Sequence, residues 1–237
     1  MTTDSAVGRT SEARAGTSPH WRSATVLLGA LLVLVVSGWA LTWVAGDRAA
    51  SQSGPEVGFA RDMSVHHEQA VVMSFLVRQR TDDPDVGTFA MEIAQGQANQ
   101  QGRMLAWLDA SGVPAPTGDY EPMAWMAAPG ADGQAHGHTA APEPADGVDP
   151  MIAGMGMATD DQLGELAGLD GVDAEVLYLQ LMFRHHQGGL EMAQAFLERS
   201  DEPALTRLAE AVVVTQDREI DIITDLLESR GAGVPDA

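Results

Sequence analysis

A long apolar run near the N-terminus is the first clear feature of the hydrophobic pattern. Residues 24–45 (ATVLLGALLVLVVSGWALTWVA) carry no charge, and a helix of this length would span about 33 Å. Tryptophans near its ends and arginines before it are typical of a membrane helix with a cytoplasmic N-terminus. We predict a cytoplasmic tail (1–23), a single-pass transmembrane signal-anchor in the cell membrane (24–45) and a stalk (46–55). Cleavage as a signal peptide, which would yield a secreted protein, is the alternative.

Beyond the stalk, apolar residues recur every three or four positions, the period of amphipathic α-helices. The pattern predicts four long helices and a short one that begins near Thr159; the long ones cover about 56–79, 84–110, 172–199 and 203–230. Pro84 and Pro203 stand at the start of the second and fourth long helices, and Gly112 and Gly231 follow their ends. Proline suits the first turn of a helix, and glycine often ends one. Residues 113–158 are rich in Pro, Gly and Ala and are predicted to form a long irregular connection.

The chain repeats itself after a shift of 119 residues, without a gap. The matched pairs are Glu56/Glu175, Met63/Met182, His66/His185, His67/His186, Met73/Met192, Arg80/Arg199, Pro84/Pro203, Gln97/Gln216, Leu108/Leu227 and Gly112/Gly231. Two helical hairpins from one duplicated unit predict an all-α fold, a four-helix bundle with a long crossover. The bundle domain would cover residues 56–231, with repeat one at 56–112, the connection at 113–158 and repeat two at 172–231.

Composition narrows the classes of function. The chain has 34 acidic and 13 basic residues, a formal charge of −21 and no cysteine. Phosphate binding needs clustered basic residues, so we expect no nucleic-acid partner. The absence of cysteine excludes thiolate metal sites, iron–sulfur clusters and cysteine nucleophiles.

Histidine and methionine form the candidate chemical site. At 100° per residue, Met63, His66, His67 and Met73 share an arc of about 120° around Ala70 on one helix. The second repeat has the same pattern, so the predicted metal ligands are Met63, His66, His67, Met73, Met182, His185, His186 and Met192. Imidazole with thioether suits copper, Cu(I) above Cu(II). Buried methionine is more often a core residue, but the repetition of adjacent histidines favours a metal.

Two weaker sets of candidates accompany these ligands. The connection contains a second set of candidate metal ligands: His136, His138, Met151, Met155 and Met157. The alternative is that the connection is a spacer whose methionines pack against the bundle. Gln97 and Gln216 occupy matched positions on the partner helices. They would hydrogen-bond the free ring N–H of ligating histidines, or else be exposed helix residues.

The segments FARDMSVHHEQAVVMS and YLQLMFRHHQGGLEMA resemble the bacterial domain-of-unknown-function 305 family, and PMIAGMGMATDDQLGEL resembles its Met-Gly-rich lead-in. The resemblance covers about residues 56–230. It implies a ferritin-like helical bundle that is usually exported, and some members are associated with copper binding or metal tolerance. The same eight histidine and methionine positions match the family motif.

Three functional hypotheses follow. The first is an extracytoplasmic, membrane-anchored copper protein that buffers, stores or confers tolerance to the metal, or passes it to a metal-handling partner protein not identified by the sequence. The second is a metal-free helical scaffold for protein interaction at the cell surface. The third, a metalloenzyme, ranks last because no acid/base pair or nucleophile stands out. If histidines bind the metal, acid below about pH 6.5 should weaken binding. The pattern leaves open whether the motifs form one site or two.

Overall fold

The computed structural model describes residues 54–113, 120–127 and 154–235. The predicted anchor at residues 24–45 lies outside these ranges. Within them, no helix has both the length and the apolar character needed to cross a membrane.

The described part of the chain is an all-α domain, as predicted. It contains five α-helices and one short 3-10 turn: α2 (Pro55–Arg78), α3 (Pro84–Ala110), η1 (Ala124–Met126), α5 (Asp160–Gly168), α6 (Gly171–Leu197) and α7 (Pro203–Ser229). The four long helices begin and end within a few residues of the predicted positions, and α5 starts one residue after Thr159.

Local chemistry explains these boundaries. Pro84 and Pro203 occupy the first turns of α3 and α7, where a missing N–H costs nothing. The Asp83 side chain accepts a hydrogen bond from the Asp85 N–H at 2.8 Å and so caps α3. Gly112 and Gly231 follow α3 and α7 with φ of +65° and +69°, the left-handed conformation that commonly ends a helix.

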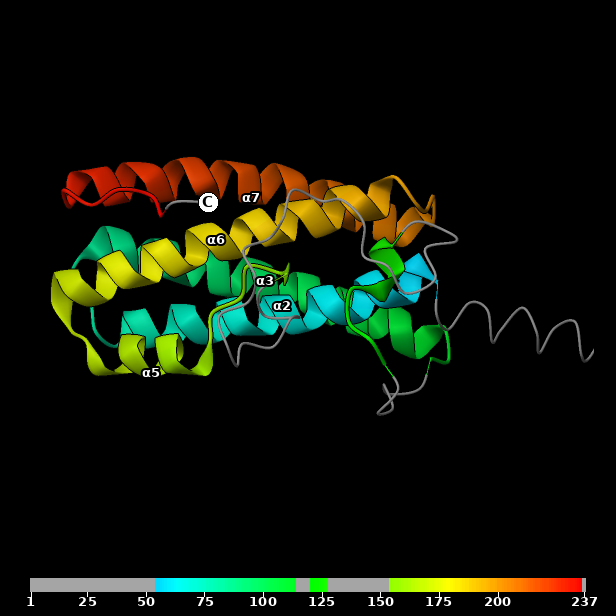
Figure 1. Cartoon of the computed structure of the whole chain (residues 1–237), viewed down its shortest axis with the longest axis horizontal. Helices are drawn as coiled ribbons and strands as arrows, with labels where there is room; N and C mark the ends of the chain where they lie inside the picture. The colour runs from blue at the N-terminus through cyan, green and yellow to red at the C-terminus, as the bar shows by residue number, and fades with distance from the viewer. Residues whose placement is uncertain (1–53, 114–119, 128–153, 236–237) are drawn as a thin grey trace, which may run out of the picture. The chain divides into compact units, whose positions relative to one another are not determined.

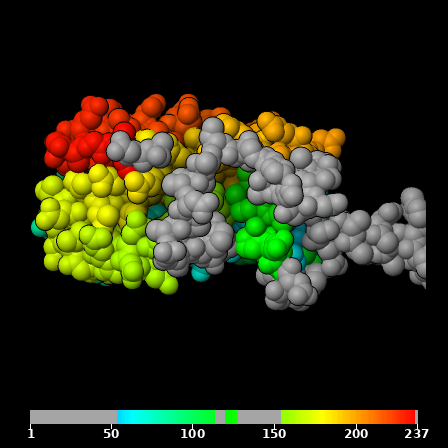
Figure 2. All heavy atoms as spheres, viewed as in Figure 1, coloured from blue at the N-terminus to red at the C-terminus, as the bar shows by residue number. Residues whose placement is uncertain are grey.

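The long helices form two hairpins, α2 with α3 and α6 with α7, and the hairpins meet mainly through α2 and α6. Figure 1 shows this arrangement, with α5 lying against α2 and α6. On the face drawn in Figure 2, α5 and α6 adjoin and α7 borders α6. Two apolar clusters fill the interior, and each takes residues from both repeats.

The two repeats make matching contacts at their turns. Thr81 donates a hydrogen bond to Glu175 Oε1 at 2.5 Å, and its counterpart Ser200 donates to Glu56 Oε1 at 2.5 Å. Each bond joins the turn of one hairpin to the first turns of the other hairpin's leading helix. The duplication is therefore preserved in tertiary contacts as well as in sequence.

One buried ion-pair network lacks a counterpart in the other repeat, where Ser111 occupies the position of Arg230. Arg230 contacts Glu175 at 2.7 Å and Asp83 at 2.5 Å, and the side chains of Arg230 and Glu175 are only 7% and 4% exposed. Arg230→Ala would leave the Glu175 charge buried and unpaired, so we expect a loss of about 3 kcal/mol in unfolding free energy. Denaturant unfolding measures it. Arg218→Ala, at an exposed position on α7, the helix that Arg230 follows, should change stability by less than about 0.5 kcal/mol. Equal losses in the two variants would contradict the expectation.

Candidate metal centre

The two His-His motifs meet in the interior, where α2 packs against α6. The rings of His66 and His185 stack with their centroids 3.6 Å apart and an interplanar angle of 25°. All four histidines of the two motifs are fully buried. The motifs therefore face each other across the contact between the two repeats, which the sequence alone left open.

Backbone carbonyls fix the orientation of the stacked rings. His185 Nε2 lies 2.9 Å from the carbonyl oxygen of His66, and His66 Nε2 lies 3.1 Å from that of Met155. A carbonyl oxygen only accepts hydrogen bonds, so Nε2 carries the hydrogen in both rings. In a neutral ring, the other nitrogen, Nδ1, then carries the lone pair.

The outer two histidines follow the same rule with side-chain partners. His67 Nε2 donates to Gln100 Oε1 at 2.7 Å, and His186 Nε2 donates to Glu219 Oε2 at 2.6 Å. Gln100 and Glu219 occupy matching positions in the 119-residue repeat. The two outer histidines are thus held in matching ways, but one partner is an amide and the other a carboxylate.

The four Nδ1 atoms are buried and have no hydrogen-bond partner among the described residues. Burial lowers the pKa of His66 and His185 well below the ordinary value of 6.5, and neighbouring imidazoles lower it further. Burial also lowers the pKa of His67 to about 4. The rings of His66, His67 and His185 are therefore neutral at pH 7. A neutral imidazole nitrogen with a fixed partner on its other nitrogen is the usual state of a metal ligand.

The four predicted methionines are fully buried and belong to two clusters. Met63 and Met192 belong to one apolar cluster, and Met73 and Met182 belong to the other. Each cluster thus contains one motif methionine from each repeat. Both repeats therefore contribute motif methionines to each apolar cluster.

The predicted role of Gln97 and Gln216 requires correction. Both side chains are buried, and neither their amide nitrogen nor their amide oxygen has a hydrogen-bond partner among the described residues. Gln216 packs against Gly189, so close that a Cβ at Gly189 would lie 2.3 Å from its Oε1. The ring hydrogen bonds come from residues three positions further along, Gln100 and Glu219. A search for the polar residue one helical turn later in both copies could have found them.

The end of the connection, at residues 154–158, contacts His66 through its backbone. The Met155 side chain is fully buried, and its carbonyl holds His66. Gln69 holds the same segment through two hydrogen bonds. Its side-chain amide accepts a hydrogen bond from the Ala158 N–H at 2.7 Å and donates one to the Ala158 carbonyl at 2.8 Å. Met157 is partly buried against the cluster that contains Met63. His136, His138 and Met151 lie outside the described residues.

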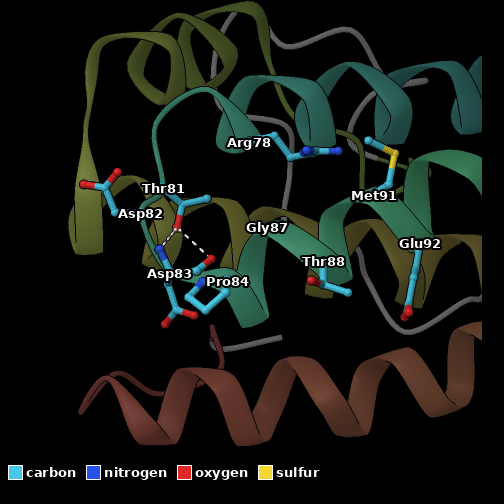
Figure 3. Close-up of a pocket in the computed structure, with 9 residues that line it drawn as sticks. All are labelled: Arg78, Thr81, Asp82, Asp83, Pro84, Gly87, Thr88, Met91 and Glu92. Carbon is cyan, nitrogen blue, oxygen red and sulfur yellow. Dashed lines mark hydrogen bonds between the residues drawn. The ribbon is translucent and has the colours of Figure 1, made fainter.

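Within the described ranges, no three histidine or acidic side chains converge on a point that could hold a metal ion. A bound metal would therefore need methionine sulfur or a change in side-chain rotamers. The open hollow shown in Figure 3, about 460 Å³ in volume, lies at the α2–α3 turn and is lined by residues such as Arg78, Thr81 and Glu92. None of the predicted ligands lines it.

The described part of the chain is an all-α domain in which two buried His-His motifs meet between two repeats. The chain belongs to the domain of unknown function 305 (DUF305) family, whose model matches residues 56–227. The crystal structure of a presumed secreted DUF305 protein from Streptomyces coelicolor is 43% identical, with a TM-score of 0.65, and the match covers 78% of this chain and 99% of that one.

More distant structures share the fold. A DUF305 fragment from Deinococcus radiodurans is 28% identical, with a TM-score of 0.57, over 74% of this chain and 96% of the fragment. CopM in its Cu(I)-bound form is 17% identical, with a TM-score of 0.51, over 74% of this chain and 96% of CopM. At that identity the likeness shows the fold alone. No curated protein matches the chain.

Proposed function

We propose that this protein binds copper through His66, His67, His185, His186 and the four buried methionines of the two motifs, as an extracytoplasmic buffer, store or tolerance protein. The observation that carries the proposal is the set of four buried Nδ1 atoms that have no hydrogen-bond partner in the part of the chain that the structure describes. A buried acceptor without a partner is costly. A metal ion that binds these lone pairs would offset that cost.

The donor types favour copper over other metals. Imidazole suits Zn²⁺ as well as copper, but the thioether of methionine is a soft ligand that suits Cu(I), while hard ions such as Mg²⁺ and Ca²⁺ prefer carboxylate or carbonyl ligands. The distant structural relative CopM has been solved in Cu(I)-bound and Cu(II)-bound forms, which supports the proposal as an analogy of fold. We also propose a weaker, secondary capture of metal by residues of the connection: His136, His138, Met151, Met155 and Met157.

The location and finer architecture belong to the same proposal. Residues 24–45 would anchor the chain, and the helical domain would lie outside the cytoplasm as a ferritin-like four-helix bundle. The Streptomyces relative, described as presumed secreted, supports export. It is equally consistent with release after signal cleavage.

A competition titration of the full-length, metal-free protein with Cu(I) tests the proposal. The key variants are Met63→Leu/Met192→Leu and Met73→Leu/Met182→Leu, because leucine nearly conserves the volume of methionine but removes the sulfur. We expect each pair to lower Cu(I) affinity at least tenfold, on the order of what the loss of a metal-site group costs. Replacing all four histidines with alanine should abolish the tight binding and leave only the weaker capture by the connection.

Met104→Leu is the matched control, because Met104 is fully buried in the same cluster as Met63 and Met192 but lies outside the two motifs. It should bind Cu(I) as the parent does. Circular dichroism would confirm that each variant keeps its helices. If the affinity for copper is unchanged after loss of the four histidines, the main site lies elsewhere; if the parent binds no copper, the proposed function is wrong.

A further inference from the structure

The two halves of the histidine centre differ in one charge. Gln100 and Glu219 match in the repeat, and each accepts a hydrogen bond from Nε2 of the second histidine of its motif. The two bonds are 2.7 and 2.6 Å long, so their geometry is nearly the same. What differs is that Glu219 brings a carboxylate to His186, where Gln100 brings a neutral amide to His67.

The Glu219 carboxylate lies at the border of the buried region. Its side chain is 14% exposed, and that of His186 is fully buried. Within the described ranges, the charged or ionisable side chain found within salt-bridge distance of the Glu219 carboxylate is that of His186, which carries a charge only if it is protonated. Because the surroundings are poorly hydrated, the field of this charge is screened less than it would be at an open surface.

A carboxylate on Nε2–H affects the opposite nitrogen in two ways. It makes the imidazole a stronger donor at Nδ1, as outer hydrogen-bond partners of metal-bound histidine do. It also places a negative charge one ring away from any cation bound at Nδ1. Both effects favour cation binding at the histidines of the second repeat, and the electrostatic effect grows with the charge of the cation.

We propose that Glu219 is a specificity-determining residue that makes the His186 half of the centre the tighter cation site and favours Cu(II) more than Cu(I). This inference rests on the proposed copper-binding function. Glu219 acts through His186 as a positioning residue and does not itself contact the metal. The counterpart Gln100 leaves the His67 half without this preference.

The test uses reciprocal isosteric substitutions in the full-length protein. Glu219→Gln makes both halves amides, and Gln100→Glu makes both halves carboxylates. We expect Glu219→Gln to lower Cu(II) affinity about tenfold. The loss of Cu(I) affinity should be about threefold. Cu(I) has half the charge of Cu(II), so its electrostatic interaction free energy with Glu219 is half as large, and half of the free energy of a tenfold change is a change of about threefold. Gln100→Glu should raise both affinities, that for Cu(II) by the larger factor.

Two controls separate this role from a merely structural one. Glu210→Gln removes the same charge from an exposed position on α7 and should leave both affinities unchanged. In metal-free protein, nitrogen NMR of the histidine rings should show Nε2–H at His186 in both the parent and Glu219→Gln. The ratio of Cu(II) to Cu(I) affinity is the decisive quantity, because loss of structure would lower both affinities together.

Equal losses for Cu(I) and Cu(II), or the same losses in Glu210→Gln, would overturn the inference while leaving copper binding intact. Absence of histidine-dependent copper binding in the parent would overturn the proposed function and this inference with it. If Glu219→Gln does not fold, Gln100→Glu decides, and an unchanged Cu(II) to Cu(I) ratio there would overturn the inference.

Discussion

The metal-free protein should lose several kcal/mol of unfolding free energy as the pH falls from 6.5 towards 4. His67 has a folded pKa of about 4 because burial opposes its charged form, against an ordinary value of 6.5. Between these values the unfolded chain binds a proton that the native ring does not, so stability is full above pH 6.5 and falls with pH. The difference corresponds to roughly 3 kcal/mol for His67 alone. His66 and His185, whose pKa values are also lowered by burial, add to it.

Denaturant unfolding between pH 6.5 and 5 measures this loss before most carboxylates titrate. Asp62 acts in the opposite direction, because burial raises the pKa of its carboxyl group. His67→Asn keeps a polar side chain but removes the titration, so its stability should fall less steeply with acid than that of the parent. Identical slopes in the parent and His67→Asn would contradict the pKa of His67 given by the structure.

The same lowered pKa values change the expectation for copper. From residue type alone, binding was expected to weaken below about pH 6.5. In the folded protein, protons compete for His67 only near pH 4, so its contribution to copper affinity should stay constant between pH 8 and 5. The reason is desolvation, which depends on burial and is absent from any reference value.

Gly188→Ala should destabilise the protein by about 3 kcal/mol, the upper range for overpacking. A Cβ at Gly188 would lie 2.0 Å from the Met155 carbonyl oxygen and 3.0 Å from Gly156 N. These neighbours are backbone atoms, and Gly156 itself has a φ of +65°, so the segment must shift as a unit. The shift would break the Met155–His66 hydrogen bond of 3.1 Å and release the proton on His66 Nε2 from its fixed partner.

Gly102→Ala is the matched control, because Gly102 is exposed in the interior of α3 and a Cβ there would meet nothing within 4 Å. Alanine is the better helix former, so this variant should gain about 0.5–1 kcal/mol. Thermal or denaturant unfolding of both variants, with nitrogen NMR of the His66 ring, provides the measurement. A Gly188→Ala protein as stable as the parent would show that the contact of Met155 with α6 contributes little.

Local patterns in the sequence predicted much of the fold. The helix at 84–110 begins at Pro84, directly after the capping residue Asp83, and ends before Gly112, whose backbone is in the left-handed conformation. Both signals depend only on residues that are neighbours in the sequence. The match of His66 with His185 predicted two equivalent hairpins, and the ring stack at 3.6 Å agrees with that duplication. Amphipathic period and repeat register are properties of one chain segment at a time, so the sequence determined the helices, their pairing in hairpins and the burial of the His-His/Met faces.

The tertiary structure alone decided how the histidines are held. The carbonyl that orients His66 belongs to Met155, 89 residues away, and the partners of the outer histidines proved to be Gln100 and Glu219 in place of Gln97 and Gln216. Helical period restricts which face a side chain occupies, but the partner it meets depends on the axial offset and rotation of two packed helices. Those offsets arise from side-chain packing across the whole interior, and they determine which imidazole nitrogen is left free for a metal.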